Sequence, residues 1–94
     1  MTKMIDVVKI ADDLGYDQMV MTDHVIMGSR TDRYPYGEFP SPPETPWYDP
    51  LITLSAIASV TSHIRLSTSV LISPLRQPVV LAKMVATLDQ LSKG

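Results

Sequence analysis

Residues 62–91 carry the clearest pattern of apolar and polar positions in the chain. From residue 64 to residue 72, apolar or β-branched side chains recur at every second position, which is typical of a half-buried β-strand. From residue 78 to residue 91 the spacing becomes that of an amphipathic helix, with Pro78 at the expected first helical position. The apolar positions of this helix are Leu81, Met84, Val85, Leu88 and Leu91. The pattern therefore predicts a strand, a turn at residues 73–77 and a helix.

The N-terminal residues predict another helix followed by another strand. Apolar side chains fall on one helical face and charged side chains on the other, and Gly15 is the expected left-handed residue at the end of the helix. The apolar set is Met4, Val7, Val8, Ala11 and Leu14, and the charged set is Lys3, Asp6, Lys9, Asp12 and Asp13. Residues 16–22 then indicate a short strand that leads into Asp23 and His24.

A third helix is predicted at residues 50–61. Asp49 is a suitable N-cap residue and Pro50 a suitable first residue. The inward positions of this helix are Leu51, Leu54, Ile57, Ala58 and Thr61. Small side chains at residues 55, 56, 58 and 59 would let another helix approach closely. The resulting order, helix, strand, loop, helix, strand, helix, is typical of an α/β fold with parallel strands joined by right-handed connections.

The loop at residues 25–48 differs from the rest of the chain. It holds five of the eight prolines and five of the six aromatic residues. That proline density excludes regular helix and strand ladders, while the aromatic residues argue against plain disorder. Long loops in compact domains are often functional. The loop is therefore predicted either to line a substrate pocket or only to pack over the edge of the sheet.

Composition limits the possible functions. The chain has 94 residues, 45% of them hydrophobic, and a net charge of −2, which suits a single small core and is short for an enzyme. There is no basic surplus to bind nucleic acid or an anionic membrane surface, and no apolar run approaches the roughly 20 residues needed to span a bilayer. The absence of cysteine excludes disulfides and thiolate catalysis. We expect a cytoplasmic location.

Candidate chemistry lies where the two predicted strands end. Because parallel strands place their C-terminal ends at one edge of a sheet, here called the carboxyl edge, Asp23–His24 and Ser69–Val70 should converge there. Arg76 is expected to bind carbonyl groups or a carboxylate near this edge, and His63 to be a solvated turn residue at the opposite edge. The two histidines are too few for a metal cluster and belong to no Ser-His-Asp set, and the four glycines form no glycine-rich phosphate loop. Topology alone leaves both a barrel and an open sheet possible.

Three sequence words carry a resemblance to a known family. They are ADDLGYDQMVMTDHV at residues 11–25, the stretch from DPLITLSAIASV to ATLDQLSKG at residues 49–94 and, more loosely, YPYGEFP at residues 34–40. Together they resemble the luciferase-like monooxygenases and the flavin- or deazaflavin-dependent oxidoreductases, in particular the branch that uses coenzyme F420. This resemblance implies a (β/α)8 TIM barrel. Residues 1–94 would be an N-terminal fragment, about a third of that barrel, without its first and later strands and inactive alone.

The resemblance also implies roles for the residues at the carboxyl edge. Asp23 and His24 would lie beside the cofactor ring, with His24 as a catalytic residue that exchanges a proton, and Ser69 and Val70 would be joined by a non-proline cis peptide behind the ring. The alternatives are that Asp23 caps the following loop, that His24 packs as an ordinary polar residue, and that the Ser69–Val70 bond is trans.

The function implied by the resemblance is an F420-dependent oxidoreductase that transfers a hydride between the deazaflavin and a small organic substrate. One alternative is an FMN-dependent monooxygenase. Another is a non-catalytic remnant or dimerisation module, since the helices at residues 50–61 and 78–91 resemble the pair through which family members form homodimers.

Overall fold

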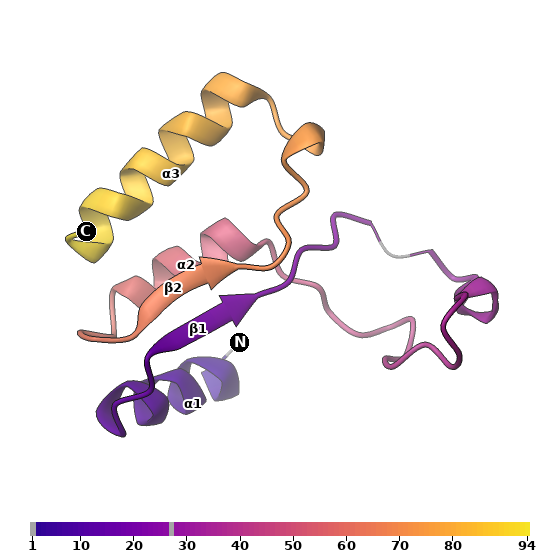
Figure 1. Ribbon diagram of the computed structural model, residues 1–94, viewed down its shortest axis with the longest axis horizontal. Coiled ribbons are helices and arrows are strands. Elements are labelled where there is room, and N and C mark those ends of the chain that lie inside the picture. The colour runs from indigo at the N-terminus through magenta and orange to yellow at the C-terminus, as the bar shows by residue number, and fades with distance from the viewer. Residues whose placement is uncertain (1, 27) are drawn as a thin grey trace.

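The computed structural model describes residues 2–26 and 28–94 (Figure 1). In chain order its elements are α1 (Thr2–Asp13), β1 (Gln18–Met21), a 3-10 helix (Thr31–Arg33), α2 (Pro50–Ala58), β2 (Arg65–Thr68), a second 3-10 helix (Ser73–Leu75) and α3 (Pro78–Ser92). The helices and strands follow the predicted order. Both strands are shorter than predicted, and α2 ends at Ala58 rather than at residue 61.

The two strands pair in parallel, as predicted. Their register runs from Gln18 opposite Arg65 to Met21 opposite Thr68. Two further backbone bonds extend the ladder, from the Arg65 N–H to the Asp17 carbonyl at 3.0 Å and from the Ser69 N–H to the Met21 carbonyl at 2.9 Å. The alternating pattern predicted a strand up to residue 72, but β1, the partner strand, ends at Met21 opposite Thr68. The residues after β2 leave the sheet at its carboxyl edge and lead to the second 3-10 helix and α3 (Figure 1).

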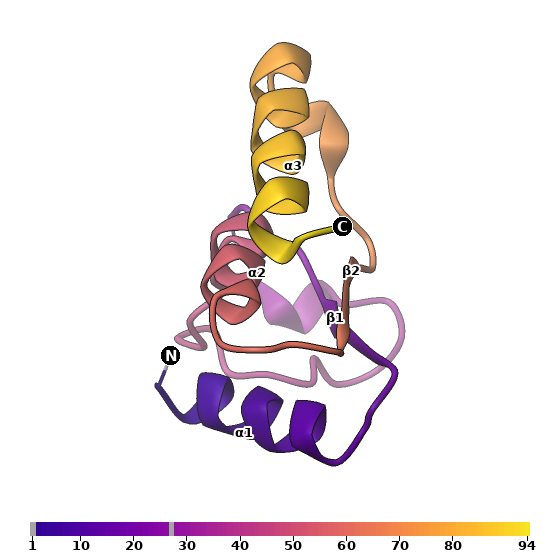
Figure 2. The ribbon, with the colours of Figure 1, turned by 90° about the vertical axis from the view of Figure 1, so that its left-hand side faces the viewer.

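Helix α2 carries most of the buried side chains. Those buried on this helix are Pro50, Leu51, Thr53, Leu54 and Ile57. Ile57 has no exposed surface and forms the core cluster with Val8 of α1 and Ile64, which directly precedes β2. Figures 1 and 2 show α2 between α1 and α3, and it packs against α3. As predicted, Leu51, Leu54 and Ile57 face inward, and this helix is the centre of the fold.

The outer helices bury less than their patterns predict. In α1, Val8 is buried, but Val7 and Leu14 are 64% and 72% exposed. In α3 no side chain is fully buried, and Val85 and Leu91 are 47% and 57% exposed. Each outer helix lies at one side of α2 and uses only part of its apolar face. Association of two chains through α2 and α3 stays a prediction.

Asp12 contradicts the prediction that the charged side of α1 faces solvent. Its side chain is buried, and its carboxylate accepts hydrogen bonds from three backbone N–H groups in the turn before β2. These bonds come from Ser62, His63 and Ile64 at 2.7, 2.8 and 2.6 Å. Three otherwise unpaired donors thus find an acceptor. Asp12 joins the end of α1 to the start of β2.

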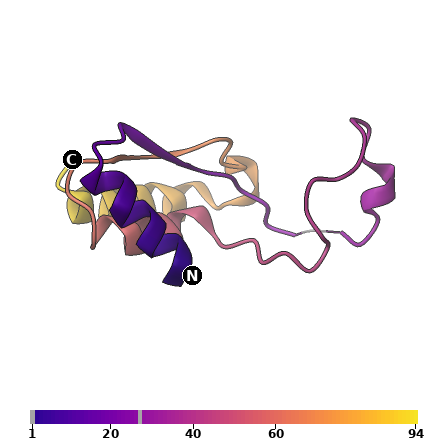
Figure 3. The same ribbon diagram turned by 90° about the horizontal axis from the view of Figure 1, so that it is seen from below.

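The loop at residues 25–48 extends away from the helices (Figures 1 and 3). As predicted, its described residues form no strand and no helix beyond the short turn at Thr31–Arg33; residue 27 lies outside the described part. Tyr34 makes edge contacts with Tyr36 and Phe39, at ring-centre distances of 5.5 and 5.2 Å. Across residues 2–26 and 28–94, no helix combines the length and apolar character required to cross a membrane.

Candidate functional site

The two segments that leave the carboxyl edge lie against each other. The Ile72 N–H donates a 2.9 Å hydrogen bond to Oδ2 of Asp23, which joins the residues after β2 to the residues after β1. The parallel register places His24 and Val70 just beyond the ends of the same strand pair. This convergence was predicted from topology and is confirmed. The roles of these residues toward a cofactor stay predictions.

Asp23 is buried and fully engaged within the protein. Its side chain is 2% exposed, and its two oxygens accept from Arg76, at 2.6 Å from Nη1 to Oδ2 and 3.2 Å from Nη2 to Oδ1. The hydrogen bond from Arg76, assisted by that from Ile72, holds the pKa of Asp23 below its ordinary value despite burial. Asp23 is therefore an ionised anchor at the carboxyl edge, with its carboxylate directed at Arg76.

His24 packs against a residue from the far end of the long loop. Its ring and that of Trp47 meet edge to face, with centres 4.2 Å apart and an angle of 62° between the planes. The His24 side chain is half-buried. The Trp47 indole N–H is buried and has no hydrogen-bond partner within the described part of the chain. This pair was not predicted, because residue spacing does not show where a long loop returns to the fold.

Ser69 and Val70 are exposed at the same edge. The peptide bond between them is cis, as the resemblance implied. Val70 is 75% exposed, and Val25 and Ile26, which follow His24, are 51% and 87% exposed. The segments that leave the sheet here thus present apolar side chains to solvent at the edge that also holds His24.

Arg76 connects the two strand ends to the start of α2. Its Nη2 lies 2.9 Å from Oδ2 of Asp49, and its Nη1 also donates to the Ile72 carbonyl at 3.3 Å. Binding of a carboxylate and a carbonyl group by Arg76 confirms its predicted role. Asp49 was predicted only as the N-cap of α2; it does cap the helix, with Oδ1 accepting from Leu51 and Ile52, and its second oxygen binds Arg76. The contact between Arg76 and Asp49 could have been predicted, because the topology places Asp23, Asp49 and Arg76 at the same carboxyl edge.

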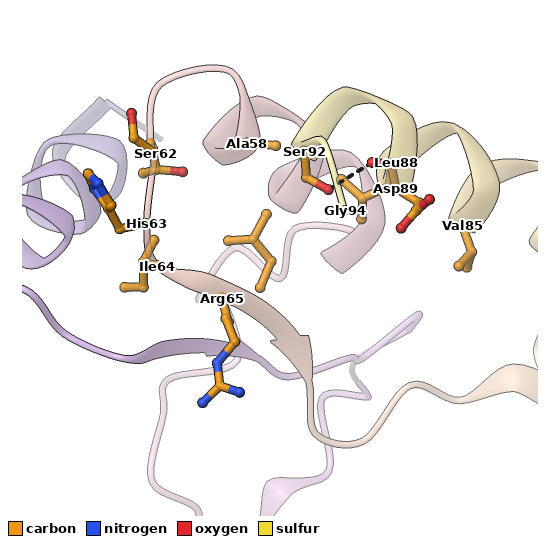
Figure 4. Close-up of a pocket in the computed structure, with 12 residues that line it drawn as sticks. Ala58, Ser62, His63, Ile64, Arg65, Val85, Leu88, Asp89, Ser92 and Gly94 are labelled. Atoms are coloured by element: carbon orange, nitrogen blue, oxygen red, sulfur yellow. Dashed lines mark hydrogen bonds between the residues drawn. The ribbon is translucent and has the colours of Figure 1, made fainter.

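The opposite edge of the sheet holds a separate cleft of about 410 Å³. Figure 4 shows the start of β2 on one side of this cleft and the C-terminal half of α3 on the other. His63 lines the cleft and is exposed, which agrees with its predicted place away from the candidate site. Among the described residues, no group of three histidine or acidic side chains is placed to hold a metal ion.

Comparison with known proteins identifies the family. The model of the luciferase-like monooxygenases matches residues 1–94. An uncharacterized protein of Mycobacterium bovis and two of Mycobacterium tuberculosis, from strains CDC 1551 and H37Rv, are each 50% identical over 46 residues, which is 49% of this chain and 16% of each relative. The matched segment therefore spans about a sixth of the length of these relatives. No solved structure matched the chain significantly.

The family belongs to the TIM-barrel superfamily, and two parallel strands with flanking helices are consistent with part of such a barrel. Family members are oxidoreductases that use flavin or F420 cofactors. The match over residues 1–94 shows that the chain belongs to the luciferase-like monooxygenase family.

Proposed function

We propose that the protein is an F420-dependent oxidoreductase that transfers a hydride between the deazaflavin and a small organic substrate. The observation that carries this proposal is the position of the His24–Trp47 pair at the carboxyl edge, beside the exposed segment of Ser69 and Val70. In parallel α/β folds, ligands bind at this edge. The choice of F420 rests on the resemblance at residues 11–25 and 49–94.

The residues at this edge suit a flat, partly polar ring. Exposed Val25, Ile26 and Val70 offer apolar surface to a ring face, while the half-buried His24, packed against Trp47, offers a polar group to its edge. When bound, F420 would supply the hydride chemistry. His24 would hold or exchange a proton near the reacting carbon. Asp23, already ionised and paired, would orient its neighbours.

The loop at residues 25–48 is proposed to cover the substrate. Its aromatic residues gather on a segment that begins next to His24 and returns to it through Trp47. Aromatic side chains provide large apolar contacts for an organic molecule and help exclude water from a redox site. The substrate class would thus depend on this loop.

Cofactor titration tests the proposal. The protein expressed from its complete reading frame is titrated separately with F420 and with FMN, and binding is followed by the absorbance and fluorescence of each cofactor. We expect F420 to bind at least tenfold more tightly than FMN. Tight FMN binding without F420 binding would instead support the monooxygenase, and binding of neither cofactor would support the non-catalytic module.

A further inference from the structure

We propose that Arg76 is the positioning residue of the candidate site: its guanidinium holds the residues at both ends of the loop at residues 25–48 and thereby keeps His24 against Trp47. Only His24 separates Asp23 from the start of this loop, and Asp49 directly follows its last residue. Both of these carboxylates bind the same guanidinium. A loop of this length is therefore joined at its base by one side chain.

The geometry of this Arg76 network is specific to arginine. Nη1 binds Oδ2 of Asp23 at 2.6 Å, and Nη2 binds Oδ1 of Asp23 at 3.2 Å and Oδ2 of Asp49 at 2.9 Å. The planar guanidinium can reach two carboxylates at once, whereas a lysine ammonium is a single point charge. The side chains of Asp23, Arg76 and Asp49 are 2%, 12% and 35% exposed, so the first pair is largely shielded from water.

The network is connected to the ring pair through the backbone. His24 directly follows Asp23, and Trp47 lies two residues before Asp49. Fixing the two carboxylates therefore limits the separation of the two rings, whose centres are 4.2 Å apart. Arg76 and Asp23 also bind the carbonyl and the N–H of Ile72, so the segment after β2 is held by the same groups.

The other ion pairs of the described residues are poor candidates for this role. The pair of Arg30 and Asp32 is exposed, with 64% and 61% of the two side chains accessible to solvent. The pair of Arg65 and Asp17 is also exposed, at 71% and 76%. Exposed pairs contribute little to stability because water and salt screen them. The pair of Arg65 and Asp17 joins the same two strands at their opposite edge, which makes it a matched control.

Two variants separate positioning from simple stability. Arg76→Lys keeps the positive charge but loses the planar fork. Asp49→Asn keeps an oxygen that can cap α2 at Leu51 and Ile52 but cannot pair as an anion with Arg76. Asp17→Asn makes the same chemical change at the exposed pair. All variants are made in the protein expressed from its complete reading frame.

The direct readout is the NMR signal of the Trp47 indole N–H, which is assigned by its loss in Trp47→Phe. We expect both Arg76→Lys and Asp49→Asn to shift or broaden this signal, while Asp17→Asn leaves it at the wild-type position. Melting temperatures show whether each variant is folded, and Asp49→Asn, which preserves the helix cap, is the deciding variant. An unchanged Trp47 signal in folded Asp49→Asn would overturn the proposal.

The expected effect of these variants on F420 binding rests on the proposed function, whereas their expected effect on the contact of His24 with Trp47 does not. We expect the same two variants to weaken F420 binding at least tenfold and Asp17→Asn to leave it unchanged. If the wild-type protein binds no F420, the proposed function fails while the Trp47 signal still tests the role of Arg76. If F420 binding survives in a variant with a displaced Trp47, the ring pair does not position the cofactor and the proposal fails in that respect.

Discussion

At the scale of single residues, buried carboxylates join distant segments of this chain. Asp12 binds three backbone N–H groups before β2, and Asp23 binds Arg76 and a backbone N–H after β2. Ionised carboxylates accept such bonds more strongly than neutral groups do. The pKa of Asp12 is lowered, chiefly by the hydrogen bond from the Ser62 N–H, and that of Asp23 is lowered chiefly by Arg76.

The lowered pKa of Asp12 predicts that the fold loses stability in acid when this carboxylate is protonated. Because its pKa is lower in the folded state, Asp12 stabilises the protein fully above its ordinary value of 3.8, and this contribution disappears as the pH falls through the lowered pKa. Asp12→Asn places an amide N–H₂ among three N–H donors. We expect its melting temperature near neutral pH to fall by about 5 °C or more, with a smaller further loss in acid than wild type shows.

The neighbouring Asp13 is the control for Asp12. It is exposed, and among the described residues no hydrogen bond joins it to the turn before β2. Asp13→Asn should leave both the melting temperature and its acid dependence unchanged. Equal melting temperatures for Asp12→Asn and Asp13→Asn at every pH would contradict the structural role of Asp12.

At the scale of elements, α2 holds the fold together. It lies between α1 and α3, and Ile57 is fully buried against Val8 and Ile64. Its start is defined by local chemistry, since Asp49 caps it and Pro50 occupies the first position. The small side chains at residues 55, 56 and 58 are half-buried, whereas Ser59 is exposed.

This role predicts a large difference between two isoleucines of α2. Ile57→Ala leaves a cavity in the core and is expected to lower the free energy of unfolding by about 2–5 kcal/mol. Ile52 lies on the same helix but is 66% exposed, so Ile52→Ala should change that free energy by less than about 0.5 kcal/mol. Chemical denaturation of both variants measures the difference, and similar losses would show that α2 is not packed as described.

The sequence predicted these elements well wherever local chemistry sets them. Proline at the first turn, the Asp49 cap and the change of apolar period define α2 and α3 without reference to the rest of the chain. The strand ends were predicted less well, because β2 stops where β1 no longer offers a partner. The exposure of Val7, Leu14 and Leu91 was also missed, since the pattern shows a face to be apolar but not how much of it a neighbour covers.

At the scale of the whole molecule, the two edges of the sheet differ in chemistry. The carboxyl edge gathers Asp23, His24, Trp47 and Arg76 from three separate segments. The opposite edge has the cleft between β2 and α3, with His63 at its side (Figure 4). Parallel pairing made the convergence of residues 23–24 with 69–70 predictable. The contact of Trp47 with His24 was not predictable, because it depends on the return path of the long loop.

The two histidines of the chain therefore test whether the cofactor binds at the carboxyl edge. His24→Ala and His63→Ala are made in the protein from the complete reading frame, and the F420 dissociation constant of each is measured by fluorescence titration. We expect His24→Ala to weaken F420 binding at least tenfold and His63→Ala to leave it within twofold of wild type. Unchanged binding in His24→Ala, or a larger loss in His63→Ala, would show that the cofactor does not bind at the carboxyl edge.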